Sequence, residues 1–494
     1  MHAPVASRLY GRKLFCLCLA AAFCILALMS TCSFLYPTNT WVDAQCFYTV
    51  GKTIARGGVL YRDIYEQKGP LLYFLHACVE WLPFEGVNPF LEIFALEVLA
   101  TAATLFFLMK ALALYLGEKP RTLAYLPLLC VLVYCNRAFS LGDSAEEFSL
   151  PMAAYVLYAT LRMLHGERHE LSRGSLYAIG VLCGCVLWIK YTCLAFAVGA
   201  LIVPLCVVIR ERNWRLLGRA AAFVSLGVLT VCVPVLLYFA LHDALDALWN
   251  VYFYNNIFAY TVDGGATARL SKVNLLIYRA SQSFGFLLFA LGGWIYALRR
   301  RWRAEALHLP CIVIVTLLVI VAGGRVYVYS VLPLAVLSVT GLPALDAALG
   351  RLWPARRKAA LIAVSALLCV GLSYPLWNRS LGQGHDNVFA YRLVEIMDPV
   401  PDATLLDLGT LDSGLYTAGD FDPITPYFCR LNLVTPEMRE EWRRIIRNGE
   451  ADYIYTGDQT LDDYCPPEEQ APYALLYSDG PSRRLYRLER PENG

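Results

Sequence analysis

The sequence predicts an all-α polytopic membrane protein with a small α/β domain at its C-terminal end. Its mean hydropathy is +0.49, and 58% of its 494 residues are hydrophobic while only 17% are charged. This composition is typical of membrane proteins and argues against a soluble enzyme. Apolar runs of about 20 residues, long enough to cross a bilayer as a helix, recur as far as Trp377. Beyond Trp377 these runs stop, and acidic residues outnumber basic ones.

The first apolar run, residues 14–35, follows the basic residues Arg8, Arg12 and Lys13. A secretory signal has a similar plan, but its apolar core is shorter and ends at a cleavage site made of small residues. We therefore predict an uncleaved spanning helix whose basic end lies in the cytoplasm. This orientation places Asp43, which follows the helix, on the outer side of the membrane.

The stretch 41–70 forms the polar part of a predicted outer loop, residues 36–87. It contains Asp43 and a Lys68-Gly69-Pro70 turn. The apolar run that follows, residues 71–83, is too short to span, and we predict an interfacial helix on the outer surface. Taken on its own, Asp43 is better explained as a solvated loop carboxylate or a helix N-cap than as a catalytic group. Lys68 is equally well explained as a turn residue that reaches lipid headgroups.

About eleven spanning helices are predicted in all. The predicted inner loops are rich in arginine, for example at 210–219 and 299–303, which is the positive-inside pattern. We therefore expect a multi-pass protein of the cell membrane with a cytoplasmic N-terminus and an extracytoplasmic C-terminal domain. Around Lys190 two short helices share about 35 residues, so a broken hairpin that stays within the membrane is an alternative. Besides the first, the predicted spans are residues 88–115, 122–139, 147–164, 175–189, 191–209, 220–240, 284–298, 307–322, 326–345 and 359–377.

The composition change after Trp377 predicts two domains, a membrane module at 1–377 and an outer domain at 378–494. An amphipathic helix is expected at Pro436–Asn448, with Gly449 as its stop signal. Alternating apolar residues between turn residues predict short strands. The predicted strands are residues 404–408, 451–457, 473–478 and 485–488.

The 17 cysteines lie mostly inside apolar runs, where they act as small hydrophobic residues. Nothing at CxxC or Cys/His spacing predicts a zinc or redox site. We therefore expect no cofactor and no metal, although a divalent metal is not excluded. Cys429 and Cys465 fall in the outer domain, where an oxidising compartment would allow them to pair. The sequence does not decide between a disulfide and two free thiols.

A second group of acids, Asp143, Glu146 and Glu147, lies at the predicted outer mouth between two apolar helices. Acids suit the first turn of a helix, so the start of the next helix explains Glu146 or Glu147 well. The whole cluster is less well explained in this way. Two carboxylate sites facing one compartment allow one to act as a general base while the other positions an acceptor hydroxyl or the base.

Two cations, Lys190 and Arg325, lie in strongly apolar surroundings. An ionised residue inside a membrane segment is costly and is a functional candidate by default. Both fall near predicted helix ends, where snorkelling to the interface is the competing explanation. Arg325 is followed by Tyr327 and Tyr329, which favours a crowded polar pocket. Glu97 lies on a predicted span and either lines a cavity or pairs with a buried cation.

Outer carboxylates together with cations at membrane level favour one kind of chemistry. Cations can hold a lipid-linked phosphate by charge-assisted hydrogen bonds, while a carboxylate removes the proton from an attacking hydroxyl. A phosphate whose charge is paired is a good leaving group, so no nucleotide is required. The sequence contains no P-loop and no GxGxxG motif, and nothing in it points to nucleic acid.

The order of these motifs resembles the GT-C glycosyltransferases that use polyprenyl-phosphate sugars. This group includes protein O-mannosyltransferases, the aminoarabinose transferase of lipid A and the RgtA/B/C/D-like group. Over roughly residues 10–375, the matching features are Asp43 after the first helix, ARGGVLYRDIYEQKGPLLYFLHA, GDSAEEFSLP, GVLCGCVLWIKYT and GGRVYVYSVLPLAVL.

The resemblance implies a role for several of these residues. Asp43 matches the catalytic base of the first outer loop, and Lys68 matches the lysine that binds the donor phosphate. Glu146, or Asp143, matches the second acidic site. Many members carry an Asp-Glu pair where this chain has Asp43-Ala44, which puts a metal role for that pair in doubt. For the remaining cationic and aromatic group, we predict phosphate binding by Lys190, Arg325 and Tyr329.

The sequence thus predicts an integral-membrane glycosyltransferase. It would move a monosaccharide from a polyprenyl-phosphate donor to an envelope glycan, lipid or protein, by direct inverting displacement on the outer face. The main alternative is a transporter or a flippase for lipid-linked sugars. Such proteins often show internal repeats, and no second copy of the first-loop pattern is present. A non-catalytic scaffold that presents the acidic outer domain is a further alternative.

Overall fold

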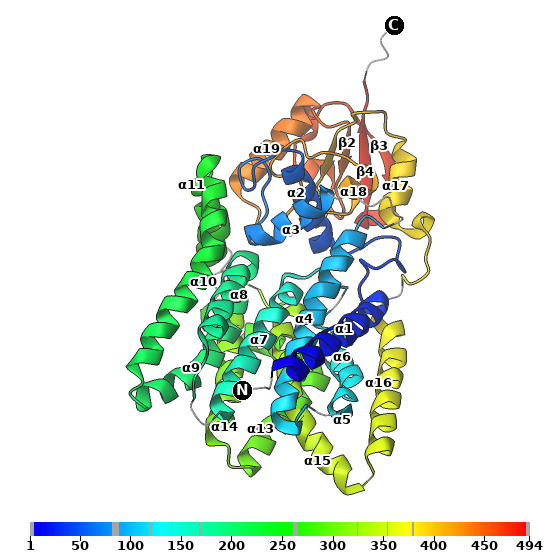
Figure 1. Ribbon diagram of the computed structural model, residues 1–494. Helices are drawn as coiled ribbons and strands as arrows, with labels where there is room; N and C mark the ends of the chain where they lie inside the picture. Colours follow the sequence, from blue (N-terminus) through cyan, green and yellow to red (C-terminus); the bar gives the residue numbers. More distant parts are fainter. Residues whose placement is uncertain are drawn as a thin grey trace. The chain divides into compact units, whose positions relative to one another are not determined.

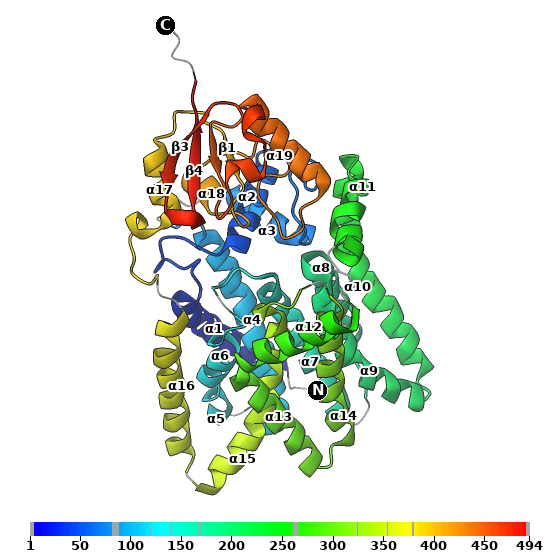
Figure 2. The ribbon, with the colours of Figure 1, turned by 180° about the vertical axis from the view of Figure 1, so that it is seen from behind.

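The chain forms two compact units (Figures 1 and 2). The computed structural model describes residues 4–81, 88–118, 120–139, 141–166, 169–259, 265–323, 325–352, 354–377 and 380–490. Unit 1 comprises Met1–Ser33, Ile93–Leu236 and Thr261–Arg379, and unit 2 comprises Phe34–Glu92, Leu237–Tyr260 and Ser380–Gly494. The first outer loop therefore belongs to the same compact unit as the C-terminal segment.

Unit 1 is helical throughout its described residues, and its long apolar runs form its long helices. An apolar chain inside a bilayer must satisfy its backbone hydrogen bonds internally, and helices do this. The helices that lie wholly or largely in unit 1 are α1 (Pro4–Met29), α4 (Leu91–Leu116), α5 (Pro120–Leu123), α6 (Leu126–Tyr134), α7 (Ala145–His165), α8 (Arg173–Lys190), η1 (Tyr191–Cys193), α9 (Leu194–Arg210), α10 (Trp214–Leu241), α12 (Gly265–Ser281), α13 (Phe284–Arg299), α14 (Arg303–Ala322), η3 (Val328–Gly341), α15 (Leu342–Leu352) and α16 (Ala355–Trp377).

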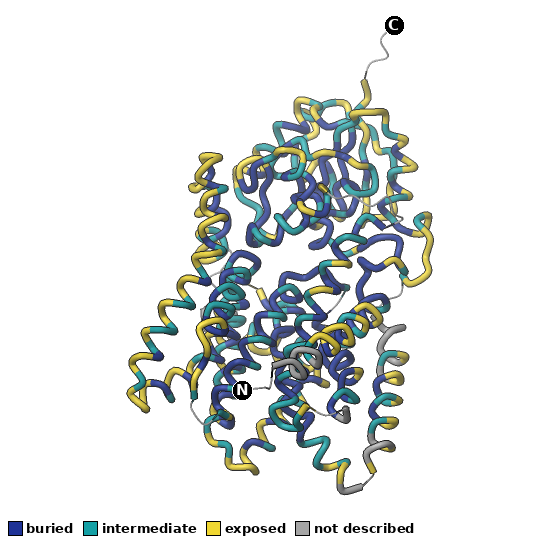
Figure 3. The backbone as a smooth tube through the Cα atoms, in the orientation of Figure 1, coloured by how far each residue is buried: buried dark blue, intermediate teal, exposed yellow. Residues whose placement is uncertain are grey.

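The protein is a multi-pass membrane protein. Within the described part of the chain, six helices are long and apolar enough to cross a membrane, or seven if the bent pair Ser271–Ser281 and Phe284–Arg299 counts as one span. Only 17% of the apolar window of α10 is buried, and Figure 3 shows exposed and half-buried residues along most of this helix. Such a surface suits contact with lipid chains. The number of qualifying helices is smaller than the predicted count of about eleven.

The difference in number arises in part where predicted spans are short or are joined. The predicted span 122–139 contains only the nine residues of α6, and the predicted spans 175–189 and 191–209 count together as Arg173–Arg210. The predicted span 326–345 is largely the 3₁₀ segment η3 and is among the six, as part of Val328–Gly350. Around Lys190 the chain leaves helical geometry, with φ −160° and ψ 97° at that residue. The short segment η1 then leads into α9. A break in the helix was predicted at this position.

Unit 2 combines helices from the first outer loop with a small four-stranded sheet. The sheet order is β1-β2-β4-β3; β1 and β2 are parallel, with Leu405 opposite Tyr453, and the other two pairs are antiparallel. The elements of unit 2 are α2 (Val42–Ala55), α3 (Pro70–Glu80), α11 (Leu245–Leu248), the π-helical η2 (Trp249–Ala259), η4 (His385–Asn387), α17 (Phe389–Met397), β1 (Leu405–Asp407), α18 (Leu415–Ala418), α19 (Pro436–Asn448), β2 (Tyr453–Tyr455), η5 (Leu461–Asp463), η6 (Pro467–Glu469), β3 (Tyr473–Ser478), η7 (Gly480–Ser482) and β4 (Arg484–Leu488).

The predicted elements of the C-terminal segment are confirmed. All four strands lie at the predicted positions, and α19 has the predicted bounds. Thr435 caps the first turn of α19 through the backbone N–H of Met438, and Gly449 ends the helix in a left-handed conformation. The helix buries Met438, Trp442, Ile445 and Ile446, one apolar stripe at helical spacing.

The first outer loop is more ordered than the sequence suggests. Its start forms the helix α2, and the predicted interfacial helix is α3; residues 82 and 83 of that prediction lie outside the described residues.

The cysteines of unit 2 are also arranged unexpectedly. Cys429 Sγ lies 3.9 Å from Cys46 Sγ on α2, and Cys465 is buried with a free thiol.

Candidate functional site

The predicted base, Asp43, is the second residue of α2. Its side chain is only 8% exposed, so it is not the solvated loop carboxylate that the sequence left open. It stands in the first turn, where the partial positive charge of the helix N-terminus favours a carboxylate. The helix therefore gives Asp43 a fixed position at its N-terminal end.

Lys68 lies against the same helix. Its Nζ is 5.5 Å from the ring centroid of Phe47, which is four residues after Asp43. Because residues four apart share one face of a helix, Lys68 sits about one turn along α2 from Asp43. Its backbone is also fixed, since its N–H donates to Tyr73 Oη at 3.0 Å and its carbonyl oxygen accepts from Tyr61.

Glu66 is a member of this site that the sequence analysis missed. Its Oε1 lies 3.6 Å from Lys68 Nζ, and its Oε2 accepts the Lys68 backbone N–H at 2.9 Å. Glu66 is 5% exposed while the Lys68 side chain is 23% exposed. A buried carboxylate thus holds an accessible ammonium group in place. The signal in the sequence is the acid two residues before the lysine of the Lys-Gly-Pro turn.

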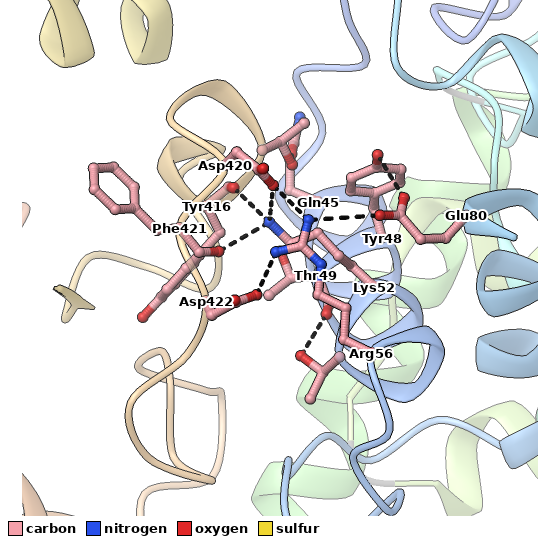
Figure 4. A network of polar contacts seen from close by, with 12 residues as sticks. Gln45, Tyr48, Thr49, Lys52, Arg56, Glu80, Tyr416, Asp420, Phe421 and Asp422 are labelled. Atoms are coloured by element: carbon pink, nitrogen blue, oxygen red, sulfur yellow. Dashed lines mark hydrogen bonds and ion pairs between the residues drawn. The ribbon is translucent and has the colours of Figure 1, made fainter. Parts of the chain in front are cut away.

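Lys52 fixes α2 to the C-terminal segment within unit 2. Its Nζ donates to the carbonyl oxygens of Tyr416 and Phe421 at 3.0 and 2.9 Å, and to Asp420 Oδ1 at 3.1 Å (Figure 4). The side chain is only 2% exposed, and burial lowers its pKa against the opposing effect of Asp420. Arg56, one turn later, binds the same carboxylate at 2.8 Å. We call the contacts of Lys52 with 416–421 the α2 clamp.

A pair of buried acids, Asp407 and Asp412, lies beside this clamp. Asp407 accepts from the backbone N–H groups of Gly409 and Ser413, at 2.9 and 2.8 Å. Asp412 accepts from Thr49 Oγ1 on α2 at 2.7 Å. Burial raises the pKa of Asp412 to about 6, and burial together with the charge of Asp412 raises the pKa of Asp407 to about 7.

These raised pKa values predict that unit 2 loses stability as the pH rises. The ordinary pKa of an aspartate is 3.8, so between about pH 4 and 7 the folded state binds more protons than the unfolded state. Stability is greatest at the acid end of this window. Asp412→Asn should flatten the dependence, because its amide can still pair with Thr49 while the charge beside Asp407 is gone. Amide exchange of β1 and β2, compared between pH 5 and pH 8, measures the effect.

Asp479→Asn is the control for this experiment. That carboxylate is 63% exposed, so its substitution should leave the pH dependence of the wild type in place. An unchanged dependence in Asp412→Asn would contradict the assignment of the effect to the buried pair.

In unit 1, the structure brings three predicted residues together. Lys190 Nζ lies 2.5 Å from Glu146 Oε1 and 5.2 Å from the ring centroid of Tyr329. Glu146 is 2% exposed, whereas the Lys190 side chain is 21% exposed. As at Glu66 and Lys68, a buried acid holds a more accessible cation. The sequence had placed Glu146 and Lys190 in separate roles.

Asp143 belongs to a different group of acids in unit 1. Its backbone N–H donates to Glu97 Oε1 at 2.7 Å, and Glu97 Oε2 accepts from Ser30 at 2.7 Å. Asp143 and Glu97 are fully buried. Glu147 lies in the first turn of α7, where its backbone N–H donates to Ser144 Oγ at 3.0 Å. Glu147 therefore stands in the helix-starting position that was one of the two explanations given for these acids.

Arg325 occupies an exposed position between α14 and η3. Tyr327 stacks on Tyr329 with ring centroids 5.1 Å apart, so the two tyrosines that follow Arg325 do form an aromatic pair. Arg325 itself is exposed, which does not match a crowded, buried pocket. Its role in phosphate binding stays a prediction.

No group of three or more histidine, cysteine or acidic residues is arranged to hold a metal ion within the described ranges. The acids of unit 2 are instead engaged by lysine, by hydroxyl groups and by backbone N–H groups.

Two solved structures resemble this chain over almost its whole length. ArnT from Cupriavidus metallidurans bound to undecaprenyl phosphate aligns with a TM-score of 0.62 at 12% identity, covering 96% of this chain and 97% of that chain. The same protein in the apo state gives 0.61 at 13% identity, covering 97% and 98%. No protein-family model and no curated protein matches the sequence. The chain therefore shares the fold of ArnT, which agrees with the GT-C-like architecture that the resemblance of its motifs predicted.

Proposed function

We propose that this protein is an integral-membrane glycosyltransferase that transfers one sugar from a polyprenyl phosphate to an acceptor in the cell envelope. The observation that supports the proposal is that Asp43 stands in the first turn of α2 while the Lys68 ammonium lies 5.5 Å from the Phe47 ring of that helix, in a chain with this fold. ArnT, which shares the fold, has been solved with undecaprenyl phosphate. The active face would be extracytoplasmic, with the N-terminus in the cytoplasm.

Asp43 would act as the general base. Its carboxylate takes the proton of an acceptor hydroxyl as that oxygen forms a bond to the anomeric carbon of the donor sugar. The bond between that carbon and the phosphate oxygen breaks, and the polyprenyl phosphate leaves with the electron pair. Such positioned proton transfer contributes about 10²- to 10⁴-fold to a rate. A single displacement inverts the anomeric configuration.

Cations would hold the phosphate and stabilise the charge that develops on it. In unit 2 this cation is Lys68, which Glu66 orients and whose side chain remains partly accessible. Lys190 with Tyr329, and Arg325, which belong to unit 1, are separate candidates for a phosphate-binding role. Glu146 would orient Lys190, and Asp143 is the alternative second acid.

The test uses the purified full chain in liposomes with a labelled polyprenyl-phosphate sugar and an envelope extract as acceptor. The proposal expects that donor is consumed and that label appears in the acceptor. Movement of intact donor between leaflets without consumption indicates a flippase. A donor that is neither moved nor consumed indicates a scaffold. Either of these two results overturns the proposal.

Lys68→Ala is expected to raise the KM for the donor by about 10- to 100-fold, because a hydrogen bond to a charged group contributes about 1.5–3 kcal/mol. Glu66→Gln should have a much smaller effect, since Lys68 keeps its charge. Initial rates at varied donor concentration measure both variants.

The double variant Glu66→Gln/Lys68→Ala separates phosphate binding from simple neutralisation of Glu66. If Lys68 binds the phosphate, the double variant should be as impaired as Lys68→Ala. Recovery of donor use in the double variant would remove Lys68 from the phosphate site.

A further inference from the structure

Unit 2 contains a cavity whose lining does not include Asp43. It has a volume of about 470 Å³. Its lining residues are Thr38, Thr40, Val42, Gln45, Val388, Phe389, Ala390, Tyr391, Thr410, Ser413, Gly414, Thr417, Tyr455, Gly457, Asp458, Ser482 and Arg483. Residues 410–417 follow β1 and residues 456–458 follow β2, and these strands are parallel. The cavity therefore opens at the carboxyl ends of parallel strands, where α/β sheets commonly bind ligands.

The cavity is on a different side of α2 from Asp43. Gln45 lines the cavity, and it comes two residues after Asp43 in the helix. Each residue turns the helix by about 100°, so the two side chains leave α2 in nearly opposite directions. The cavity is thus a separate site and not an extension of the proposed reaction centre.

Two hydroxyl groups in the cavity wall already donate their protons within the protein. Ser413 Oγ donates to Asp407 Oδ2 at 2.5 Å, and Thr417 Oγ1 donates to Gln45 Oε1 at 2.5 Å. Each hydroxyl has one proton and two lone pairs. Both oxygens are therefore left as acceptors, and they favour a ligand that supplies hydrogen-bond donors.

Aromatic rings complete the wall. Phe389, Tyr391 and Tyr455 line the cavity, and such rings offer flat apolar faces for packing. Gly414 stands beside Gln45 with φ +88°, a conformation that L side chains rarely adopt. This glycine keeps the wall open at the point where a larger side chain would enter the cavity.

The two charges at the cavity have partners of opposite sign. Asp458 binds Arg430 at 2.8 Å, and Arg483 lies 3.7 Å from Asp479 while its guanidinium stacks on Phe389 at 4.0 Å. A cavity with balanced charges does not select a strongly anionic or cationic ligand. The uncharged groups that remain to recognise a ligand are hydroxyl groups and aromatic rings.

We infer that this cavity binds a neutral saccharide. A sugar ring carries hydroxyl donors on its edge and C–H groups on its face, which match the acceptor oxygens and the aromatic rings. The inference deepens the proposed function and rests on it in one respect: the bound unit would be a sugar of a glycan acceptor that extends beyond the residue attacked at Asp43. The acceptor would then be a saccharide chain.

The test measures saccharide binding to the full chain in nanodiscs by saturation-transfer difference NMR. The probes are the methyl glycosides of glucose, galactose, mannose and N-acetylglucosamine, and the disaccharides maltose and cellobiose. At least one probe should bind, and Tyr391→Ala and Thr417→Val should each weaken it by about tenfold or more, the loss expected for one good contact. Thr417→Val keeps the shape of the side chain, which guards against a folding defect. Tyr254→Ala, at a residue outside the cavity that is 50% exposed, should leave binding unchanged.

Absence of binding by every probe, or binding that both cavity variants leave unchanged, overturns the inference. The donor-consumption assay keeps this result separate from the proposed function. Binding without donor consumption leaves the saccharide site standing and rejects the transferase. Donor consumption without saccharide binding rejects the saccharide site and leaves the transferase standing.

Discussion

Asp43→Asn should lower the rate of sugar transfer by at least about 100-fold while changing the KM for the donor by no more than about twofold. The amide has the shape of the carboxylate but cannot accept the proton of the attacking hydroxyl, so the loss falls on kcat. Donor binding depends on cations, which this substitution leaves in place. The measurement is the initial rate of label transfer in liposomes at varied donor concentration.

Asp246→Asn provides the matched control for Asp43→Asn. Asp246 is an exposed carboxylate on α11 in the same unit, so losing its charge should leave the rate unchanged. Asp43 also stands in the first turn of α2, where losing a charge costs up to about 1 kcal/mol of helix stability. Amide exchange of α2 separates that small loss from the loss of catalysis. Transfer at close to the wild-type rate in Asp43→Asn would remove it as the base.

The sequence predicted best the elements whose signals are local. Helix α19 has its cap at Thr435, its proline at Pro436 and its stop at Gly449 within one short stretch, and its bounds were predicted correctly. Helix α2 has no such signals: Trp41 offers no side-chain cap. Its stability comes instead from packing on α3, where Phe47 meets the rings of Tyr73 and His76. Contacts of this kind are not visible in a local pattern.

The residues of the candidate site also fall into two groups, those that the sequence could name and those that it could not. Asp43 and Lys68 could be named because the order of the motifs that contain them resembles that of a known family, whereas each residue taken alone has an ordinary structural explanation. Lys52 could not, because its partner Asp420 is 368 residues away in the chain and nothing near Lys52 signals burial. Glu146 and Lys190 were both named, but their pairing joins residues 44 apart. A single sequence gives the members of such pairs without showing which member meets which.

Lys52→Met should destabilise the docking of α2 by about 3 kcal/mol. The substitution keeps the aliphatic stem but removes the donor that two buried carbonyl oxygens share, and leaving buried acceptors unsatisfied costs about 1–3 kcal/mol each. Asp420 is 73% exposed, so water can solvate its carboxylate once Lys52 is gone. A loss of this size lowers the amide-exchange protection of α2 by about 100-fold. The same loss frees Asp43 from its fixed position, so the transfer rate should fall with it.

Arg56→Met is the control that tests why burial matters. Arg56 binds the same Asp420 carboxylate at 2.8 Å, yet its side chain is 38% exposed. An ion pair in contact with water contributes only about 0–1 kcal/mol, so Arg56→Met should leave α2 protected and the transfer rate nearly unchanged. Equal effects of the two substitutions would show that the ion pairs with the Asp420 carboxylate hold α2 in place. A large effect confined to Lys52→Met would show that the buried carbonyl oxygens of Tyr416 and Phe421 do so, and that the C-terminal segment positions the proposed base through them.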